Sequence, residues 1–299
     1  MSVDSPKFSV LIAVYNAERF ISKVIDSVLA QTYPAHEIIV IDDGSTDRTP
    51  EILKKYADHI MSWRTPNSGS PSAPLNTALR MVTGDYVAFL DHDDLWFKNK
   101  LEKHAEFIRK FPGIGVFCSD VVVRRRHLNM RLRKRFDLMI YKKELNFNAP
   151  LKLDVFRALI RENFAGIWSN AVIKKEVIDR AGDFDDGLKY SEDYDYLLRC
   201  AKVTNFVLMS DVVGYKTTHE SNMTNDVVRT CEKNINVLKK TRHALGSSIE
   251  DRELIKECSR AIAYHHYAIG NVYFQLGKIQ RAFSAYLQKM EVFVHHIHS

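Results

Sequence analysis

Two clusters of carboxylates follow apolar runs in the first third of the chain. They are Asp42-Asp43-Gly44-Ser45 and Asp91-His92-Asp93-Asp94. Three carboxylates within four residues repel one another unless a cation lies among them, and the hard divalent ions that oxygen ligands favour are Mg²⁺ or Mn²⁺. Taken alone, either cluster has a second explanation, a solvated acidic turn that caps the next helix.

A third acidic pair, Glu192-Asp193, begins a segment of helical periodicity in the second half of the chain. A carboxylate at such a position can take a proton from a substrate hydroxyl as a general base. The structural explanation is that acids in the first turn of a helix interact favourably with its macrodipole. Arg199, two helical turns later, is expected to pair with an acid.

The segments around these acids predict an α/β fold with a mainly parallel sheet. Helix-period segments separate the apolar runs, which implies βαβ units. Such sheets bind ligands beyond the carboxyl ends of their strands, where both aspartate clusters fall. The Pro- and Ser-rich stretch 64–74 is expected to be a loop. Buried strands are predicted at residues 8–14, 37–41, 59–63, 86–90 and 116–123.

The second half is expected to be less regular and to end in helices. Strands are predicted near residues 168–173, 205–209 and 212–218, with a helix at 191–201 and only helix from Asp226 onward. The tail resembles one tetratricopeptide-type helical hairpin. A single repeat cannot bury its own faces, so we expect it to pack on the α/β domain or on another subunit. The residues at the small and aromatic positions of the repeat are Gly270, Tyr273, Gly277, Ala282 and Tyr286.

Composition excludes several classes of protein. The chain has 299 residues, is 45% hydrophobic and contains 12 Gly and 8 Pro, which fits a globular chain with either one large domain or one domain and a smaller appendage. The four cysteines form no CxxC pair, so neither a zinc ribbon nor a disulfide framework is indicated, and a cytoplasmic location is expected. No apolar run approaches the ~18–20 residues of a membrane span, and the first eight residues hold no signal region.

The segment 124–135 is strongly basic, with seven Arg or Lys residues. One interpretation is a solvated charged loop. The other is attraction to anionic lipid headgroups or to a pyrophosphate-linked lipid acceptor, which would make the protein peripheral at the inner membrane face. Nucleic acid is not expected as a partner, because no aromatic residue is interleaved to stack on bases.

As an ordered set, the motifs resemble one family. The run VLIAVYNAE, followed by VIDDGSTD, NSG and FLDHDDLW, is similar to the N-terminal half of the inverting glycosyltransferases of family 2, which have the GT-A fold. The resemblance covers about Phe8 to Asp120 and resumes at GDFDDGLKYSEDYDYLLR, the acceptor-side segment. It implies a catalytic domain at 1–225, with a nucleotide-sugar half at about 1–120 and an acceptor half at about 121–225. Residues 226–299 would form a separate helical region.

The resemblance also implies roles for single residues. The chain departs from the family pattern at Pro74, where a basic residue is common, and at Asn76, which lies one residue late. Asp43 would accept an N–H of the base, which leaves uracil, guanine and thymine open, with uracil favoured. The nucleotide contacts would be the backbone near Ala13, the ring of Tyr15, the carboxylate of Asp43, the loop residues Asn67 and Gly69, and Asp93 near the ribose. The implied metal ligands are Asp93, Asp94 and His219, and Asp193 would be the base.

Several of these residues have structural explanations as well. Tyr15 is alternatively an interfacial aromatic with its hydroxyl in water, and His219 a surface or capping residue. For Asp42 a charge at a helix N-terminus is favoured. Core packing is favoured for Cys118, Cys200 and Trp168.

The expected function is transfer of a sugar, with inversion, from a nucleotide diphosphate sugar to an acceptor hydroxyl in the synthesis of a cell-surface polysaccharide, O-antigen or lipid-linked glycan. A dinucleotide dehydrogenase is excluded because no GxGxxG follows the first strand. A sugar-nucleotide nucleotidyltransferase remains an alternative, although Tyr15-Asn16-Ala17-Glu18 is unlike the Gly-rich basic loop it needs. A non-catalytic binding or scaffold protein acting through the helical tail is the other alternative, and that tail is also where a homo-oligomer or partner contact is expected.

Overall fold

The computed structural model describes residues 5–124, 133–134, 139, 142–165, 168–188, 190–217 and 226–294. His219 and most of the basic segment 124–135 lie outside the described residues. The chain forms two compact units. The first comprises Met1–Val155 and Phe164–His219, and the second comprises Phe156–Asn163 and Glu220–Ser299.

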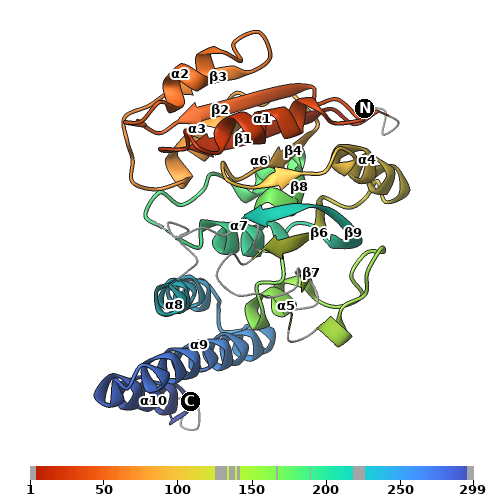
Figure 1. The fold of residues 1–299 in the computed structure, drawn as a ribbon. Coiled ribbons are helices and arrows are strands. Elements are labelled where there is room, and N and C mark those ends of the chain that lie inside the picture. The colour runs from red at the N-terminus through yellow and green to blue at the C-terminus, as the bar shows by residue number, and fades with distance from the viewer. Residues whose placement is uncertain are drawn as a thin grey trace. The chain divides into compact units, whose positions relative to one another are not determined.

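The first unit is built on one mixed sheet (Figure 1). Its strand order is β3-β2-β1-β4-β8-β6-β9-β5, and β7 pairs with β6. The four strands β1 to β4 are mutually parallel, β8 runs antiparallel between β4 and β6, and β9 is parallel to β6. The strands are β1 (Phe8–Val14), β2 (Glu37–Asp42), β3 (Met61–Arg64), β4 (Tyr86–Phe89), β5 (Leu95–Trp96), β6 (Val116–Arg124), β7 (Arg133–Lys134), β8 (Ala171–Lys174) and β9 (Phe206–Thr217).

Helices cover both faces of this sheet, as the predicted class requires. The crossovers β1-α1-β2 and β2-α2-β3 move outward in one direction, whereas β3-α3-β4 returns past β2 and β1. Because such crossovers are right-handed, α3 lies on the opposite face from α1 and α2, and the chain switches direction between β1 and β4. The helices of this unit are α1 (Ile21–Leu29), α2 (Thr49–Lys54), α3 (Ser72–Leu79), α4 (Lys100–Lys110), α6 (Lys175–Ala181) and α7 (Glu192–Ala201), with 3₁₀ turns η2 (Lys142–Glu144) and η3 (Trp168–Asn170).

Helices are the only regular elements among the described residues of the second unit, as predicted for the end of the chain. It contains α5 (Val155–Arg161), α8 (Val227–His243), α9 (Ile249–Gln275) and α10 (Ile279–Val294). The helices α9 and α10 form a hairpin that turns at Gly277, whose φ is +69°. Gly270 lets them approach closely, since a Cβ there would lie 2.3 Å from the Tyr286 ring.

Several elements differ from the sequence prediction. The two strands expected at 205–209 and 212–218 are one strand, β9, with register irregularities opposite Asp120. Residues 168–170 form η3 rather than strand, and the third strand begins at Met61, two residues later than expected. The short helices α5 and α6 were not predicted, because neither seven-residue helix is long enough for a clear periodicity.

Candidate active site

The carboxylates of Asp91, Asp93 and Asp94 converge just beyond the carboxyl end of β4. Their ligand atoms all lie within 4.8 Å of one another. The neighbouring parallel strand β1 ends at Val14, so the cluster lies at the point where the sheet changes winding direction. Open α/β sheets bind ligands at this position.

The side chain of Asp94 is fully buried and is held on both oxygens. The Ser169 hydroxyl donates to its Oδ2 at 2.6 Å, and the backbone N–H of Thr217 donates to its Oδ1 at 2.9 Å. The same Ser169 oxygen accepts the backbone N–H of Asp91 at 3.0 Å. Two elements distant in sequence, the turn η3 and the strand β9, therefore fix the orientation of one aspartate.

A lysine that the sequence analysis did not select reaches the same acids. Nζ of Lys216 lies 3.7 Å from Oδ2 of Asp91 and 3.9 Å from Oδ2 of Asp94. No local pattern around Lys216 indicated this contact, because it depends on β9 lying beyond β6 in the sheet. Ser169 was missed for the same reason.

Burial and neighbouring charges shift the pKa values of two acids in the cluster. Burial raises the pKa of Asp94 to about 7; Lys216 opposes the shift, and the charges of Asp91 and Asp93 add to it. Burial likewise raises the pKa of Asp91, again opposed by Lys216. Buried carboxylates this close favour a proton or a cation among them. The all-oxygen donor set suits a hard divalent cation such as Mg²⁺ or Mn²⁺.

The pair Glu192-Asp193 begins α7 directly after Ser191, which has a left-handed φ of 59°. Glu192 is buried, and burial together with the charges of Asp193 and Asp91 raises its pKa to about 8. Because the charge of Asp91 contributes to the raised pKa of Glu192, the start of α7 lies within the electrostatic field of the acid cluster. Asp193 is partly exposed, and its Oδ1 accepts the backbone N–H of Tyr194 at 2.7 Å.

Four aromatic side chains, from β4, η3 and the segment that contains α7, pack against one another. The ring centroids of Trp168 and Phe89 are 4.5 Å apart, and those of Phe184 and Tyr196 are 4.0 Å apart in a stacked pair. Trp168 is 5% exposed and all four cysteines are free and buried, so the expected core packing of Trp168, Cys118 and Cys200 is confirmed.

Arg199 has the structural role predicted for it. Its Nε lies 3.0 Å from Oδ2 of Asp195, and its guanidinium also donates to the Ala181 carbonyl at 2.6 Å. Asp195 is therefore committed to an ion pair within α7.

The Asp42-Asp43 turn holds the loop that follows β3. The carboxylate of Asp43 accepts the backbone N–H of Ser68 at 3.0 Å and the hydroxyl of the same residue at 3.0 Å. The Asn67 side chain donates to the Asp43 carbonyl at 3.0 Å. Asp42 does not lie at a helix N-terminus: its Oδ1 accepts the backbone N–H of Ser45 at 2.9 Å, within the turn itself.

Glycine is required at the centre of this turn. Gly44 has a φ of +74°, and a Cβ there would lie 2.7 Å from the backbone nitrogen of Asn67. Gly69 also has a positive φ, +67°. The loop residues Asn67 and Gly69 thus lie against the Asp43 turn, which brings three of the predicted nucleotide contacts together.

The remaining predicted nucleotide contacts lie at the end of β1. Ala13 pairs with Ile41 of β2, and Tyr15 follows the strand with 44% of its side chain exposed. The next residue, Asn16, has a φ of 49° and accepts the backbone N–H of Thr46 at 2.8 Å through Oδ1. This contact ties the end of β1 to the turn after β2, and the exposed Tyr15 directly precedes it.

Asn76 faces away from these contacts, toward the acceptor-side segment. Its amide donates to the Phe184 carbonyl at 3.0 Å and accepts the Phe184 N–H at 2.7 Å. The Ser70 hydroxyl donates to the Leu188 carbonyl at 2.9 Å. These bonds connect α3 and its preceding loop to the segment that leads into α7.

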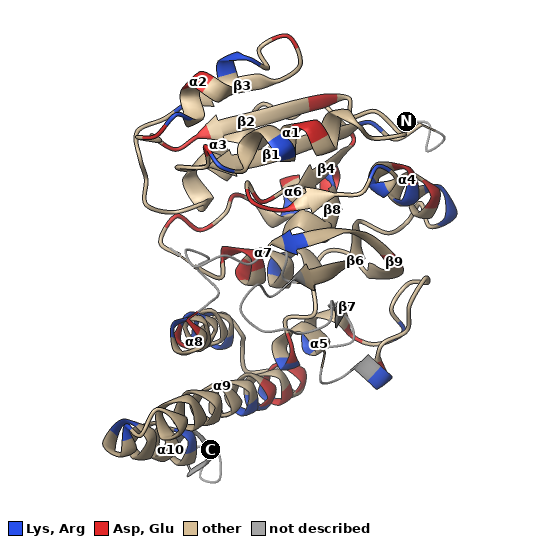
Figure 2. Ribbon diagram, viewed as in Figure 1, with Lys and Arg blue, Asp and Glu red and all other residues tan. Residues whose placement is uncertain are grey.

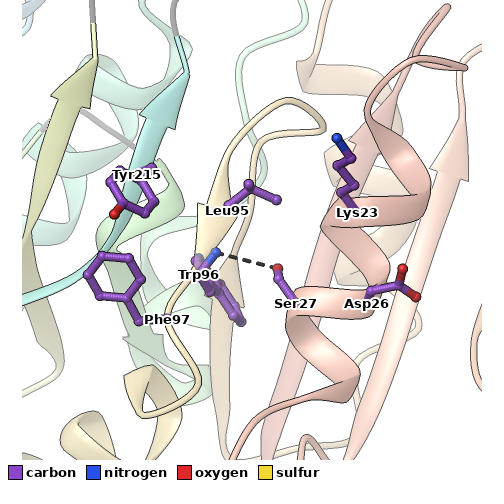
Figure 3. Close-up of a pocket in the computed structure, with 7 residues that line it drawn as sticks. All are labelled: Lys23, Asp26, Ser27, Leu95, Trp96, Phe97 and Tyr215. Carbon is purple, nitrogen blue, oxygen red and sulfur yellow. Dashed lines mark hydrogen bonds between the residues drawn. The ribbon is translucent and has the colours of Figure 1, made fainter.

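A shallow groove of about 400 Å³ lies on the other side of β5 and β9 (Figure 3). Its walls include Leu95, which follows the acid cluster directly, and Tyr215, which precedes Lys216. Adjacent residues of a strand point to opposite faces, so Tyr215 faces the groove while Lys216 faces the acids. The groove and the acid cluster therefore share strands but not a face.

His219, the third predicted metal ligand, lies outside the described residues, as do the side chains of the basic segment 124–135. In the part of the chain that is described, no helix is long and apolar enough to cross a bilayer.

The sequence matches Glycosyl transferase family 2 over residues 9–180. The chain belongs to this family. It is 31% identical over 232 residues to an uncharacterized glycosyltransferase of Rickettsia typhi. The matched region makes up 77% of this chain and 69% of that protein. It is also 39% identical over 107 residues to the poly(ribitol-phosphate) beta-N-acetylglucosaminyltransferase TarS of Staphylococcus aureus, covering 34% of this chain and 19% of TarS.

Solved structures show the same fold. A crystal structure of Staphylococcus aureus TarS in complex with UDP-GlcNAc matches with a TM-score of 0.63 and 18% identity, covering 95% of this chain and 92% of that chain. The mannosyltransferase PcManGT of Pyrobaculum calidifontis, in complex with GDP-Man and Mn²⁺, matches with a TM-score of 0.61 and 17% identity over 96% of this chain and 85% of that chain. The predicted GT-A fold, family and general activity, sugar transfer from a nucleotide sugar, are confirmed.

Proposed function

We propose that this protein is a metal-dependent, inverting glycosyltransferase that uses a UDP-sugar and a glycan or lipid-linked glycan acceptor. In this proposal residues 1–225 form the catalytic domain and residues 226–299 a separate helical region. The observation that carries the proposal is the convergence of Asp91, Asp93 and Asp94 at the point where the sheet changes direction. The mannosyltransferase neighbour, whose structure contains GDP-Man and Mn²⁺, supports a divalent ion.

The acid cluster would hold Mg²⁺ or Mn²⁺ through Asp93 and Asp94, with His219 as the third protein ligand. A bound ion of this kind stabilises, as a Lewis acid, the negative charge that grows on the departing diphosphate. Lys216 forms ion pairs with Asp91 and Asp94. A cation bound to those carboxylates would compete with Lys216 for them, and the ammonium group would then pair with a phosphate oxygen of the donor.

The nucleotide would lie across the ends of β1 and β2. Tyr15 offers an exposed ring to the base, and the turn formed by Asp43, Asn67 and Gly69 offers polar groups beside it. Asp43 is already bonded to Ser68, so base recognition at Asp43 requires that its carboxylate accept one more N–H than it does now.

Asp193 would act as the base on the acceptor side. It takes the proton of the acceptor hydroxyl as that oxygen bonds to the anomeric carbon, while the bond from the anomeric carbon to the diphosphate oxygen breaks on the opposite face. This displacement inverts the anomeric configuration. The raised pKa of Glu192, about 8, keeps that carboxyl protonated at neutral pH and leaves Asp193 as the base of the pair.

The acceptor is proposed from the relatives and from the basic segment. TarS of Staphylococcus aureus is named for poly(ribitol-phosphate), and a Bacillus subtilis relative is named for teichuronic acid biosynthesis. Both names refer to acidic polymers, since one contains phosphate and the other is an acid. The seven basic residues of 124–135 suit attraction to such a polymer or to anionic lipid at the inner membrane face.

Titration calorimetry with UDP, GDP and dTDP, with and without Mn²⁺, tests the donor and the metal. We expect UDP to bind with Mn²⁺ and to lose most of its affinity when EDTA is added. Lys216→Met should bind Mn²⁺ more tightly in the absence of nucleotide, because a competing ammonium group is gone, but should bind UDP more weakly when Mn²⁺ is present. UDP affinity that is indifferent to EDTA would exclude the metal from donor binding.

The configuration of the product tests the reaction class. Proton NMR of the glycoside formed from a UDP-α-sugar should show a β linkage. Formation of pyrophosphate from a nucleoside triphosphate and a sugar phosphate would favour a nucleotidyltransferase instead, and donor binding without turnover would favour a scaffold protein.

A further inference from the structure

Two adjacent residues of the turn η3 contact the two ends of the proposed active site. The Ser169 hydroxyl donates to Oδ2 of Asp94 at 2.6 Å. The preceding residue, Trp168, packs against α7, the helix that begins with the proposed base. Successive side chains of a 3₁₀ turn are rotated by about 120°, so two neighbours point in different directions. The turn therefore lies between the metal ligands and the start of α7.

The ring of Trp168 shows which side chain of α7 lies beside it. Its centroid is 5.9 Å from that of Tyr196, which follows Glu192 by four residues. Residues four apart share one face of a helix, so Glu192 lies on the face that is turned to Trp168. Both residues are buried, Trp168 with 5% and Glu192 with 8% exposed. Asp193 lies about 100° further round the helix and is partly exposed.

The indole N–H of Trp168 is a buried donor next to the Glu192 carboxyl. Burial and the charge of Asp193 raise the pKa of Glu192, and the Trp168 indole opposes this rise as a hydrogen-bond donor. The contact is longer or more bent than an ordinary hydrogen bond, because Nε1 has no partner of normal geometry among the residues that the structure describes. Hydrogen bonds in substrate-free active sites are often long in this way and shorten in the complex with substrate.

Neighbouring rings hold the indole in place. Its centroid lies 4.5 Å from that of Phe89, in the strand that leads to the acid cluster, and 5.3 Å from that of Phe184. Phe184 in turn stacks on Tyr196 at 4.0 Å. The strand β4, the turn η3 and the helix α7 therefore pack together through Trp168, and a shift of the indole would disturb the contacts on both sides.

The first turn of α7 needs such a contact because it is acidic. It carries Glu192, Asp193 and Asp195, and its start is red in Figure 2. Asp195 is paired with Arg199, whereas the charges of Glu192 and Asp193 repel each other. A hydrogen bond that fixes Glu192 would leave the direction of Asp193 determined by the helix alone.

We propose that Trp168 is a positioning residue for the base. Its indole N–H donates to the Glu192 carboxyl when the donor binds, which fixes the first turn of α7 and the direction of Asp193. With Ser169 beside it, η3 becomes the element that sets the distance between the metal and the base. Inverting displacement needs this distance fixed, because the attacking oxygen, the anomeric carbon and the leaving oxygen lie in one line. The inference rests on the proposed function, in which Asp94 holds the metal and Asp193 is the base.

Trp168→Phe tests the role, because it keeps an aromatic ring and removes the N–H. It should lower kcat about 10- to 100-fold, the loss that a small misplacement of a reacting group causes. Affinity for UDP with Mn²⁺ should stay close to that of wild type, because Ser169 still holds Asp94. Trp96→Phe is the matched control: it removes the indole N–H that donates to the Ser169 carbonyl and should weaken UDP binding instead. Calorimetry measures affinity, and UDP release from UDP-GlcNAc, or from another UDP-sugar on which the wild type acts, measures kcat.

A double-mutant cycle with Glu192 separates positioning from packing. Glu192→Leu removes the oxygen that the N–H would reach, so Trp168→Phe should cause no further loss of kcat in that background. Glu192→Gln keeps a carbonyl oxygen, so Trp168→Phe should cost as much there as in the wild type. The effects of Trp96→Phe and Glu192→Leu should be independent, because Trp96 donates to Ser169 and not to Glu192.

NMR of the indole N–H groups tests the bond without turnover. The chain has three tryptophans, and the two Phe variants assign the signals of Trp96 and Trp168. With UDP and Mg²⁺ present, the Trp168 indole proton should resonate further downfield in the wild type than in Glu192→Leu, whereas the Trp96 proton should not move. This comparison keeps Trp168 in place, so it decides the question even if Trp168→Phe does not fold.

Three results would overturn the proposal: a kcat of Trp168→Phe within a few-fold of wild type, an equal loss in the Glu192→Leu background, or a Trp168 indole signal indifferent to Glu192→Leu. Asp193→Asn distinguishes this failure from failure of the proposed function. If Asp193→Asn lowers turnover and Trp168→Phe does not, only the positioning role is wrong. If Asp193→Asn turns over like wild type, the base assignment is wrong and the positioning role is wrong with it.

Discussion

The Ser169 hydroxyl donates to Oδ2 of Asp94 at 2.6 Å, and this short bond joins two segments that lie 75 residues apart. The Ser169 carbonyl also accepts the indole N–H of Trp96 at 2.9 Å. The turn η3 therefore holds the strands on both sides of Asp94. The orientation of the proposed metal ligand depends on this turn as much as on its own strand.

Ser169→Ala is expected to weaken Mn²⁺-dependent binding of UDP by about 10- to 100-fold, because groups that orient a metal ligand contribute on this scale. Calorimetry with and without Mn²⁺ measures the change. Ser119→Ala is the matched control, since it removes a buried hydroxyl that donates to the Asn170 carbonyl and touches no acid. Equal losses in both variants would mean that Ser169 acts only through packing.

Asp193→Asn is expected to retain UDP binding and to lower turnover by about 10² to 10⁴, the usual contribution of a general base. Asp195→Asn, two residues later on α7, should instead lower the melting temperature, because it breaks the ion pair with Arg199, and should leave turnover per folded molecule unchanged. If Asp193→Asn turns over within a few-fold of wild type, the base is a different residue.

Gly44→Ala is expected to reduce the free energy of unfolding by about 1 to 3 kcal/mol. The cause is a Cβ forced into a left-handed conformation and against the Asn67 backbone. Urea denaturation measures the loss, and UDP affinity should fall with it because the loop can no longer lie on the turn. Gly113→Ala is the control, since a Cβ there meets nothing within 4 Å. Equal stability of the two variants would contradict the steric argument.

Because of Lys100, the free energy of unfolding should depend on pH in the alkaline range. Burial lowers the pKa of this fully buried lysine from 10.5 to about 7. Its Nζ lies 4.8 Å from the centre of the Trp96 ring and has no hydrogen-bond partner among the residues that the structure describes. Between these two pKa values the unfolded chain binds a proton that the folded protein does not. The free energy of unfolding should therefore fall by up to about 1.4 kcal/mol per unit as pH decreases from about 10 to about 7.

Urea denaturation of Lys100→Met at pH values across this range checks the prediction. The variant should lose the pH dependence and should be more stable than wild type at neutral pH, because no buried amine remains to be neutralised. Lys103→Met, which removes a lysine paired with Glu106 near the surface of the same helix, should keep the dependence. A pH dependence that survives in Lys100→Met would assign it to other groups.

The sequence predicted the parts of the molecule that local patterns control. Strands β1, β2, β4 and β6 are apolar runs, and the acids of Asp91–Asp94 lie together in space because they are adjacent in sequence. Lys216 and Ser169 could not be predicted, because they reach those acids only through tertiary structure. Strand β9 pairs with β5, which follows the acids directly, and Ser169 lies in η3 just before β8. Strand β9 was divided in two because Ser210-Asp211 has the composition of a turn, whereas pairing with β6 carries the strand through it.

Asn76 illustrates the same limit for a single side chain. The sequence marked it only as a departure from the family pattern, one residue late in the predicted nucleotide loop. In the structure its amide bonds to both backbone groups of Phe184, which lies 108 residues later. A buried amide with a reciprocal pair of backbone bonds is a structural clamp. The sequence contains no periodicity that could reveal a partner so distant.

The position of β8 between β4 and β6 limits how much of the sheet can form while the chain is being synthesised. Strands β1 to β4 and β6 are all synthesised before β8. Because β8 pairs with both β4 and β6, β6 cannot join the sheet beside β4 until β8 has been made. Until Lys174 has been made, the growing chain presents the open edge of β4, which is a template for pairing with another nascent chain. Non-local pairing of this kind also slows folding. A fragment that ends at residue 120, the half proposed to bind the donor, would leave that edge unpaired, and we expect it to be prone to aggregation when expressed alone.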